Sequence, residues 1–122
     1  MPVMPTSLPT TPHPLPDQLI DLIAQRFRCL GEPMRIKLLD CLRDGEATVG
    51  ELQQATGASQ QNVSKHLGLL LNAGMVSRAK RGTASVYAIA DEGVFELCEQ
   101  VCGGLRRQLH DLDTLLAGGG DR

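Results

Sequence analysis

The chain has 122 residues, 42% of them hydrophobic and 2% aromatic, and its 12 Lys and Arg against 14 Asp and Glu give a formal charge of −2. This length fits one domain, and the few aromatic residues predict an aliphatic core whose burial is completed by dimerisation. The acidic balance argues against nucleic acid as a partner unless positive charge is concentrated locally. Because no apolar run approaches the ~20 residues that span a bilayer, we expect a cytoplasmic protein with no membrane partner.

The two ends of the chain differ in composition from the middle. Six prolines in the first sixteen residues predict a disordered arm over 1–16, which lacks the basic start and continuous apolar core of a signal peptide. The glycine-rich end predicts a disordered tail over 118–122. The folded domain is therefore expected over 17–117.

Helical periodicity and capping signals predict a mainly α fold with one small β-hairpin. Asp17 is a suitable N-cap for the first helix, Pro33 suits the first turn of the second, and Thr48 with Glu51 forms a capping box that opens the third. The predicted helices cover 17–29, 32–44, 48–57, 59–72 and a long segment from 91 onward, and the hairpin covers 76–89.

The fourth predicted helix has an unusual polar face. Its apolar positions Val63, Leu67, Leu70 and Leu71 recur at helical spacing, and Lys65 is the only charged residue between 59 and 72. The opposite face carries short and medium polar side chains, which suit hydrogen bonds to phosphates and base edges in a major groove. A face without acidic residues is compatible with a DNA duplex, so this helix is predicted to be a recognition helix.

The hairpin after this helix has a basic tip. Val76 leads into a strand that carries Arg78, Lys80 and Arg81, and Gly82 with Thr83 turns the chain back. From 59 to 88 the chain has four basic residues and no acidic residue, so the local field is positive. Together the helix pair and hairpin predict a winged helix-turn-helix. The candidate DNA-binding residues are Ser59, Gln60, Gln61, Asn62, Ser64, Lys65, His66, Arg78, Lys80 and Arg81.

The segment from 27 to 89, about half of the chain, resembles the ArsR/SmtB family of bacterial metal- and stress-sensing repressors. The resemblance is carried by LGEPMRIKLLDCL (30–42), VGEL (49–52), SQQNVSKHLGLLLNAGMV (59–76) and RAKRGTASVYAI (78–89). It implies a homodimer, with the first and last helices at its interface, which represses an operon until an inducer releases it from DNA. It does not specify the inducer, because sensor sites in this family lie at several places on one scaffold. For such a dimer we expect an operator that is an imperfect inverted repeat.

Four cysteines are candidates for the sensor. Cys98 and Cys102 are four residues apart on a predicted helix, so both thiols project from one face, and Cys29 is a candidate third ligand if the first and last helices meet. Such thiolates suit a soft ion: As(III) or Sb(III) for a three-sulfur site, or Hg(II) for two or three sulfurs. Buried cysteines are also common as small apolar residues, and this interpretation is favoured for Cys41. No constitutive cofactor is predicted.

The chain departs from the better-known sensor sites of the family. Gly93 and Gly104 stand where a zinc-type site on the last helix has histidines, and the GELQQAT segment lacks the Cys-x-Cys of the related arsenic and cadmium site. Cys41 and Cys102 resemble the pair of redox-sensing members, but Cys41 is offset by one residue and Cys102 by about one turn. A soft-ion site therefore ranks above a dithiol or persulfide switch.

Two other classes of function compete with a sensor. The sequence has no Cys-x-x-Cys, no glycine-rich phosphate loop after a strand and no nucleophile elbow, so an enzyme is not expected. A constitutive DNA binder without a sensor stays open, and it would bind its operator equally with or without added metal.

Overall fold

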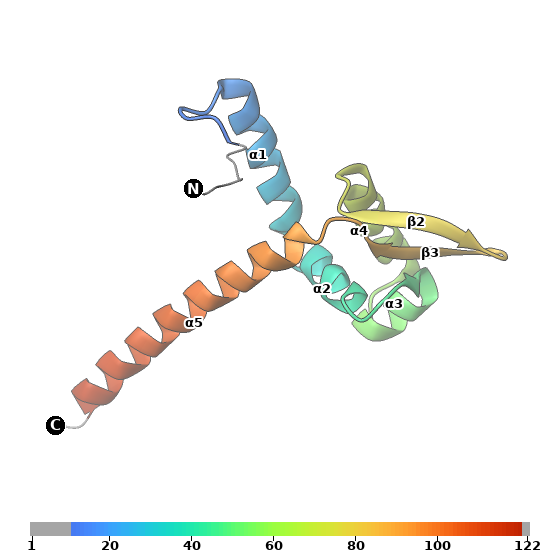
Figure 1. Cartoon of the computed structure of the whole chain (residues 1–122). Coiled ribbons are helices and arrows are strands. Elements are labelled where there is room, and N and C mark those ends of the chain that lie inside the picture. Colours follow the sequence, from blue (N-terminus) through green and yellow to red (C-terminus); the bar gives the residue numbers. More distant parts are fainter. Residues whose placement is uncertain (1–10, 121–122) are drawn as a thin grey trace, which may run out of the picture.

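The computed structural model describes residues 11–120, so part of the predicted arm (1–10) and the last two residues of the predicted tail lie outside the described residues. Residues 11–16 form no helix or strand. The elements, shown in Figure 1, are α1 (Asp17–Leu30), α2 (Pro33–Leu42), β1 (Ala47–Thr48), α3 (Val49–Thr56), α4 (Gln60–Asn72), β2 (Val76–Arg81), β3 (Ala84–Ile89) and α5 (Gly93–Gly120). The five predicted helices and the hairpin are confirmed. Helix α5 continues three residues beyond the expected domain boundary at 117.

Local capping explains where most helices begin. The Glu32 side chain accepts hydrogen bonds from the backbone N–H groups of Met34 and Arg35 and so caps α2. The capping box of Thr48 and Glu51 is present at the start of α3. At α1 the prediction was wrong in detail: Pro16 is the N-cap, and Asp17 is the first helical residue, where its charge still favours the helix N-terminus.

Two other boundaries differ from the sequence prediction. Helix α2 ends at Leu42, two residues before the predicted end. Helix α5 begins at Gly93, because the Asp91 carboxylate, 2.9 Å from the Gly93 backbone nitrogen, accepts its hydrogen bond ahead of the helix.

The sheet has three antiparallel strands in the order β1-β3-β2, one more than predicted. Strands β2 and β3 form the hairpin, in which Val76 pairs with Ile89 and Arg81 with Ala84. The additional strand β1 is two residues long and pairs Ala47 with Tyr87 on the other edge of β3. Such a short strand has too few residues to show alternation, so its pairing depends on the position of β3.

The core lies between α2, α3, α4 and the base of the sheet. Its buried apolar residues are Leu38, Leu39, Leu42, Leu52, Val63, Leu67, Leu70, Met75, Val76, Tyr87 and Val94. Apart from Tyr87 and the thioether of Met75 they are aliphatic, as the low aromatic content predicted. The α3–α4 turn is set by Gly57, whose φ of 76° is a left-handed conformation that glycine adopts without strain.

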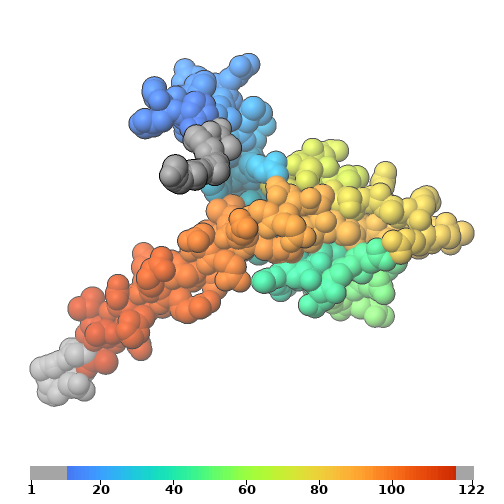
Figure 2. All heavy atoms as spheres, viewed as in Figure 1, coloured from blue at the N-terminus to red at the C-terminus, as the bar shows by residue number. Residues whose placement is uncertain are grey.

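Helices α1 and α5 extend from this body in different directions (Figure 1), and the space-filling view shows both standing out from it (Figure 2). No residue of α1 is fully buried. The apolar stripe of α5 is also exposed, at Val101, Leu105, Leu109, Leu112, Leu115 and Leu116. None of the helices within 11–120 is long and apolar enough to cross a membrane.

Candidate nucleic-acid interface and thiol groups

Packing against the core fixes which face of α4 is exposed. Val63, Leu67 and Leu70 are fully buried, and this holds the opposite side of the helix toward solvent. Four of the candidate DNA-binding residues are exposed there: Gln60, Gln61, Ser64 and Lys65. The arrangement therefore provides a polar helix face with a single positive charge.

Ser59 caps the first turn of α4. The Ser59 hydroxyl lies 3.1 Å from the backbone nitrogen of Asn62 and accepts its hydrogen bond. Asn62 itself is half-buried. Ser59 thus holds the end of the helix in place, and its hydroxyl hydrogen stays available to a phosphate.

His66 does not belong to the exposed face, contrary to its place among the candidate DNA-binding residues. It is only 6% exposed, and Arg35 Nη1 lies 3.0 Å from its Nδ1. The sequence could not resolve this, because one residue on a helix is ~100° of rotation and His66 follows the exposed Lys65. His66 is therefore a contact between α4 and α2 and not part of the exposed polar face.

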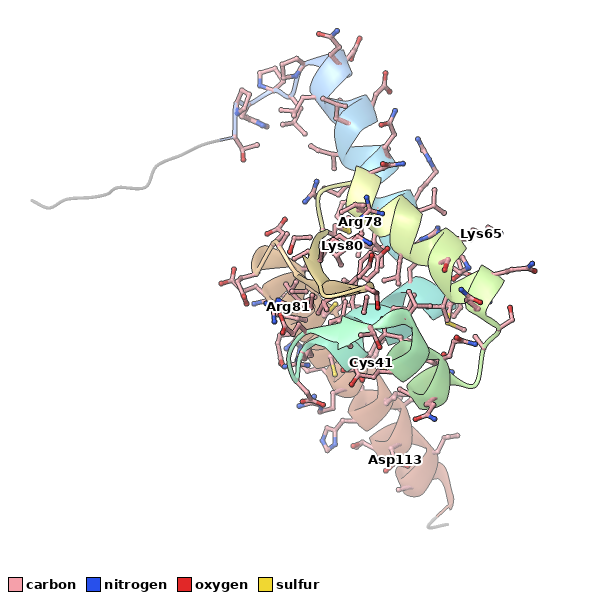
Figure 3. All side chains as sticks on the ribbon, turned by 90° about the vertical axis from the view of Figure 1, so that its right-hand side faces the viewer. Cys41, Lys65, Arg78, Lys80, Arg81 and Asp113 are labelled. Carbon is pink, nitrogen blue, oxygen red and sulfur yellow. The ribbon has the colours of Figure 1, made fainter. Side chains whose placement is uncertain are left out.

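The wing carries its basic residues on two faces of the hairpin. Arg78 and Lys80 are two residues apart on β2, so their side chains share one face, while Arg81 belongs to the other. Figure 3, which looks onto the tip of the wing, labels these residues together with Lys65 of α4. All four are exposed. Among the described residues, no ion pair involves Lys65, Arg78 or Lys80.

Arg81 differs from the other basic residues, because Glu46 binds it. The two nitrogens Nη1 and Nη2 of Arg81 donate to the Glu46 carboxylate at 2.6 and 3.0 Å. Glu46 precedes β1, and the sheet brings it beside the tip of the wing. The segment from 59 to 88 contains no acidic residue, so its composition could not reveal a partner that comes from outside it.

We expect the substitution Glu46→Gln to tighten DNA binding roughly two- to fivefold, the energy range of a partly exposed ion pair. The change frees the Arg81 guanidinium and removes a negative charge from the wing, so the salt dependence of binding should also steepen. Fluorescence anisotropy with a labelled duplex at several salt concentrations measures both. Glu99→Gln, which removes a carboxylate 3.6 Å from Arg43, is the matched control and should change neither.

The exposed amide of Gln61 has a different expected role. Gln61→Ala should reduce discrimination between the preferred site and a site with one altered base pair by about 1–3 kcal/mol, because a glutamine amide can bond an adenine edge bidentately. The salt slope should stay the same, because every interaction with a phosphate is kept. Competition binding with single-base variants of the site measures the change, and an unaltered preference at every position contradicts the base-reading role.

The four cysteines have different environments, and none forms a disulfide. Cys29, Cys41 and Cys98 are half-buried and pack against the hydrophobic core. Cys102 is exposed on α5, where Arg106 Nη2 lies 3.1 Å from its sulfur and donates to it. Cys102 is therefore the thiol that solvent and small ions reach most directly.

Cys41 is the least suited to react. Burial raises the pKa of its thiol above the ordinary value, and the neighbouring carboxylates of Asp40 and Asp44 raise it further, against the opposing charge of Lys37. The thiolate is the nucleophile in disulfide formation and in metal binding. These surroundings therefore disfavour the redox pair of Cys41 and Cys102.

We expect iodoacetamide to modify Cys102 first and Cys41 last when the reduced native protein is alkylated near neutral pH. Cys102 is exposed, whereas burial and two neighbouring carboxylates raise the pKa of the Cys41 thiol and so lower its reactivity. Mass spectrometry of peptides from timed samples gives the order, and the same reaction in denaturant is the control in which the differences should vanish. Modification of Cys41 ahead of Cys102 contradicts the assignment.

A single chain does not assemble the predicted metal site. Within residues 11–120, no three His, Cys, Asp or Glu side chains are grouped so as to hold a metal ion. Cys98 and Cys102 are on one face of α5, as predicted, but Cys29 belongs to α1 and does not complete a three-ligand group with them. A three-sulfur site therefore needs either a conformational change that brings α1 to α5 or a sulfur from a second copy of the chain.

The helix pair α3–α4, joined by a tight turn and followed by a basic hairpin, defines a winged helix-turn-helix protein of the DNA-binding regulator class. Residues 32–78 match the model of the bacterial regulatory proteins of the arsR family. The helix-turn-helix-type transcriptional regulator Rv0081 of Mycobacterium tuberculosis is 36% identical over 108 residues, which cover 84% of this chain and 95% of Rv0081. The chain belongs to the ArsR family.

Solved structures agree with this assignment. The crystal structure of Rv0081 aligns with a TM-score of 0.71 at 35% identity, covering 79% of this chain and 97% of that one. The homodimeric winged helix-turn-helix DNA-binding domain of Mb0332 from Mycobacterium bovis aligns with a TM-score of 0.69 at 30% identity, over 80% of this chain and 93% of that one. A third relative, the Streptomyces lividans protein named "Probable mercury resistance operon repressor", is 39% identical over 77 residues, 63% of this chain and 62% of its own length.

Proposed function

We propose that this protein is a homodimeric transcriptional repressor that leaves its operator when a soft, thiophilic ion binds its cysteine thiolates. The proposed DNA-binding activity is supported by the exposed polar face of α4. Beside this face lies a wing whose Arg78 and Lys80 have no ion-pair partner within residues 11–120. A dimer presents two such faces to successive major grooves. Its operator is therefore an imperfect inverted repeat with half-sites ~10 bp apart or a multiple of that.

The dimer is supported by the two helices that extend from the body. Leu109 of α5 is 64% exposed and Phe27 of α1 is 55% exposed in the single chain. Large apolar side chains in a continuous stripe on a soluble protein indicate an interface. The homodimeric state of the Mb0332 domain, which has the same fold, supports the same conclusion.

The inducer part rests on Cys98 and Cys102. Residues at i and i+4 of a helix have Cβ atoms ~5–6 Å apart, which lets two thiolates bind one soft ion without distorting α5. Cys29 is the third ligand. Because Cys29 is not grouped with them in one chain, a second copy or a movement of α1 against α5 completes the site. Arsenite and antimonite fit three sulfurs.

Hg(II) is the second candidate inducer, and the Streptomyces lividans relative, whose name mentions a mercury resistance operon, favours it. Two thiolates suffice for Hg(II), so Cys98 and Cys102 alone would serve. The dithiol or persulfide alternative through Cys41 and Cys102 ranks lower, because burial and two carboxylates raise the pKa of the Cys41 thiol.

Release follows from linkage between the two sites. If the ion binds the DNA-free conformation more tightly, then DNA must weaken ion binding by the same factor, typically 1–3 kcal/mol of coupling. The proposed ligand thiols lie on α1 and α5, the same two helices that carry the exposed apolar side chains. Ion binding there changes how the two copies sit together and hence the spacing of the two α4 helices.

The test uses the reduced full chain and a labelled duplex that the protein itself selects from random DNA. Anisotropy is followed while arsenite or, separately, Hg(II) is added to the complex. We expect release at about one ion per site, and loss of release in Cys98→Ser and Cys102→Ser. Cys41→Ser is the matched control, because it removes one of the four thiols but should keep the response.

The other results are distinguishable. Loss of release in Cys41→Ser, with release of the wild type by an oxidant or a persulfide, contradicts the soft-ion site and supports the dithiol switch. A wild type that no agent releases contradicts the sensor and leaves a constitutive DNA binder. A sequence-selected duplex without an inverted repeat contradicts the dimeric operator.

A further inference from the structure

His66 is the one buried polar side chain among the described residues. It lies on α4 directly after the exposed Lys65, and both of its ring nitrogens face charged groups. Nδ1 is 3.0 Å from Arg35 Nη1, and Nε2 is 3.8 Å from Glu32 Oε1. A buried polar group with such partners is expensive to disrupt, so these contacts constrain the position of α4.

The partner at Nδ1 fixes the form of the ring. An arginine guanidinium can only donate hydrogen bonds, so Nδ1 must accept with its lone pair. The ring proton is therefore on Nε2, on the side of the Glu32 carboxylate. The hydrogen bond selects one orientation of the ring and, through it, one rotation of α4 about its own axis.

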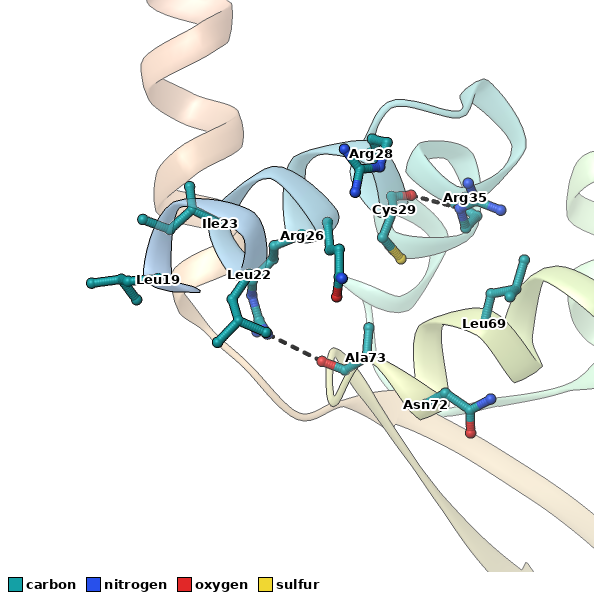
Figure 4. A pocket seen from close by; sticks show the side chains of 11 residues that line it. Leu19, Leu22, Ile23, Arg26, Arg28, Cys29, Arg35, Leu69, Asn72 and Ala73 are labelled. Carbon is teal, nitrogen blue, oxygen red and sulfur yellow. Dashed lines mark hydrogen bonds between the residues drawn. The ribbon is translucent and has the colours of Figure 1, made fainter. Parts of the chain in front are cut away.

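Arg35 extends this contact to α1. Its Nε donates to the backbone carbonyl of Cys29, one of the carbonyl groups that the end of α1 leaves without a helical partner. Figure 4 shows this bond at the edge of a cavity of about 690 Å³, which Cys29 and Arg35 line together with Leu69 and Asn72 of α4. One guanidinium thus joins the end of α1 that bears a candidate sensor thiol to the recognition helix.

Glu32, the second charged neighbour of the His66 ring, is itself held in place at the start of α2. Its carboxylate accepts from the Met34 backbone nitrogen at 2.7 Å and from the Arg35 nitrogen at 3.3 Å, and it caps α2. Desolvation raises the pKa of Glu32, but these hydrogen bonds and the positive charge of Arg35 outweigh it, so the pKa is lowered overall. The carboxylate is therefore ionised where it faces the ring.

We propose that Arg35 and His66 are positioning residues that hold α4 in its DNA-binding orientation and transmit to it a change at the Cys29 end of α1. The second half rests on the proposed sensor function. A ligand that moves the Cys29 backbone removes the acceptor of Arg35 Nε, and the guanidinium can then no longer hold the ring. The exposed Ser64 and Lys65 precede His66 on the same helix and move with it.

The experiment compares two substitutions in the full reduced protein. His66→Leu removes the acceptor, whereas His66→Asn keeps an amide oxygen near the position of Nδ1. We expect His66→Leu to weaken operator binding about tenfold, the size expected when a hydrogen bond to a charged group is removed. Binding of arsenite or Hg(II) to the free protein should stay unchanged, while the ion-dependent change in DNA affinity should shrink. His66→Asn should restore both.

Leu71→Ala is the matched control, because it removes half-buried volume from the same helix and keeps both the Arg35 and the His66 side chains. It should lower the unfolding temperature yet keep the ion-dependent change in DNA affinity. ¹⁵N NMR of the wild-type imidazole adds a signature that stability cannot mimic: the proton should be on Nε2. A proton on Nδ1, or a His66→Leu protein with wild-type affinity and response, overturns the proposal.

Failure of the sensor is distinguishable from failure of this coupling. If neither arsenite nor Hg(II) releases the wild type, the proposed sensor function fails and the transmission half fails with it. The positioning half is then still decided by the operator affinity of His66→Leu against His66→Asn and by the imidazole tautomer.

Discussion

Replacement of both Lys65 and Lys80 by alanine is expected to weaken operator binding by roughly two orders of magnitude near 0.1 M salt. Lys65 is the one charge on the exposed face of α4, and Lys80 lies on the wing without an ion-pair partner among residues 11–120. In a dimer the substitutions remove up to four lysine–phosphate interactions. The slope of log affinity against log salt should fall by about 0.9 for each phosphate that is no longer neutralised.

Anisotropy titrations from low to moderate salt measure both the affinity and the slope. Lys37→Ala is the control for loss of a lysine charge outside the proposed interface, because Lys37 lies on α2 in the cavity between α2 and α5. The double variant should weaken preferred and altered sites alike, since phosphate contacts carry no sequence information. An unchanged slope means that these lysines do not touch the backbone of the duplex.

The substitution Leu109→Asp is expected to convert the proposed dimer into a monomer at micromolar concentration and to reduce operator affinity more than a hundredfold. Burying one leucine contributes about 1.5–3 kcal/mol, and a dimer buries two copies. An aspartate at the same place adds the cost of a buried charge. A lone monomer also lacks the second recognition helix, so only one half-site is held.

Sedimentation equilibrium gives the association state, and circular dichroism shows that the monomer keeps its helices. Thr114→Asp, an exposed position on the side of α5 opposite the apolar stripe, is the matched control and should stay dimeric. Leu109→Asp that remains dimeric with wild-type affinity places the interface elsewhere. Exposed side chains on α1 such as Phe27 would then be the next to substitute.

The recognition elements could be predicted because their signals are local. Ser59 caps α4 through a residue three positions away, and the spacing of Val63, Leu67 and Leu70 alone defines the buried side of the helix. Gly57 marks the turn between α3 and α4. Each signal acts within one or two helical turns, where sequence distance and spatial distance are nearly the same.

The candidate site was less predictable where partners are distant in sequence. Arg81 was predicted as a DNA-binding residue, but Glu46, 35 residues earlier, forms an ion pair with it. His66 was predicted as a DNA-binding residue, but it is buried beside Arg35, 31 residues earlier. The number and type of such charges follow from the chain, whereas their pairing depends on which elements pack together.

The sequence by itself determined the helices, the hairpin, the aliphatic core and the polar face of α4. Periodicity, caps and turn residues are signals that involve only residues close together along the chain. Only the tertiary structure decided that β1 joins the sheet, that His66 is buried and that Cys29, Cys98 and Cys102 form no group of three in one chain. These outcomes depend on the packing of elements that lie far apart along the chain. The exposure of the apolar stripe of α5 also follows only from the tertiary structure. An apolar pattern predicts that a helix face is buried, but it does not show whether the same chain or a second copy covers that face.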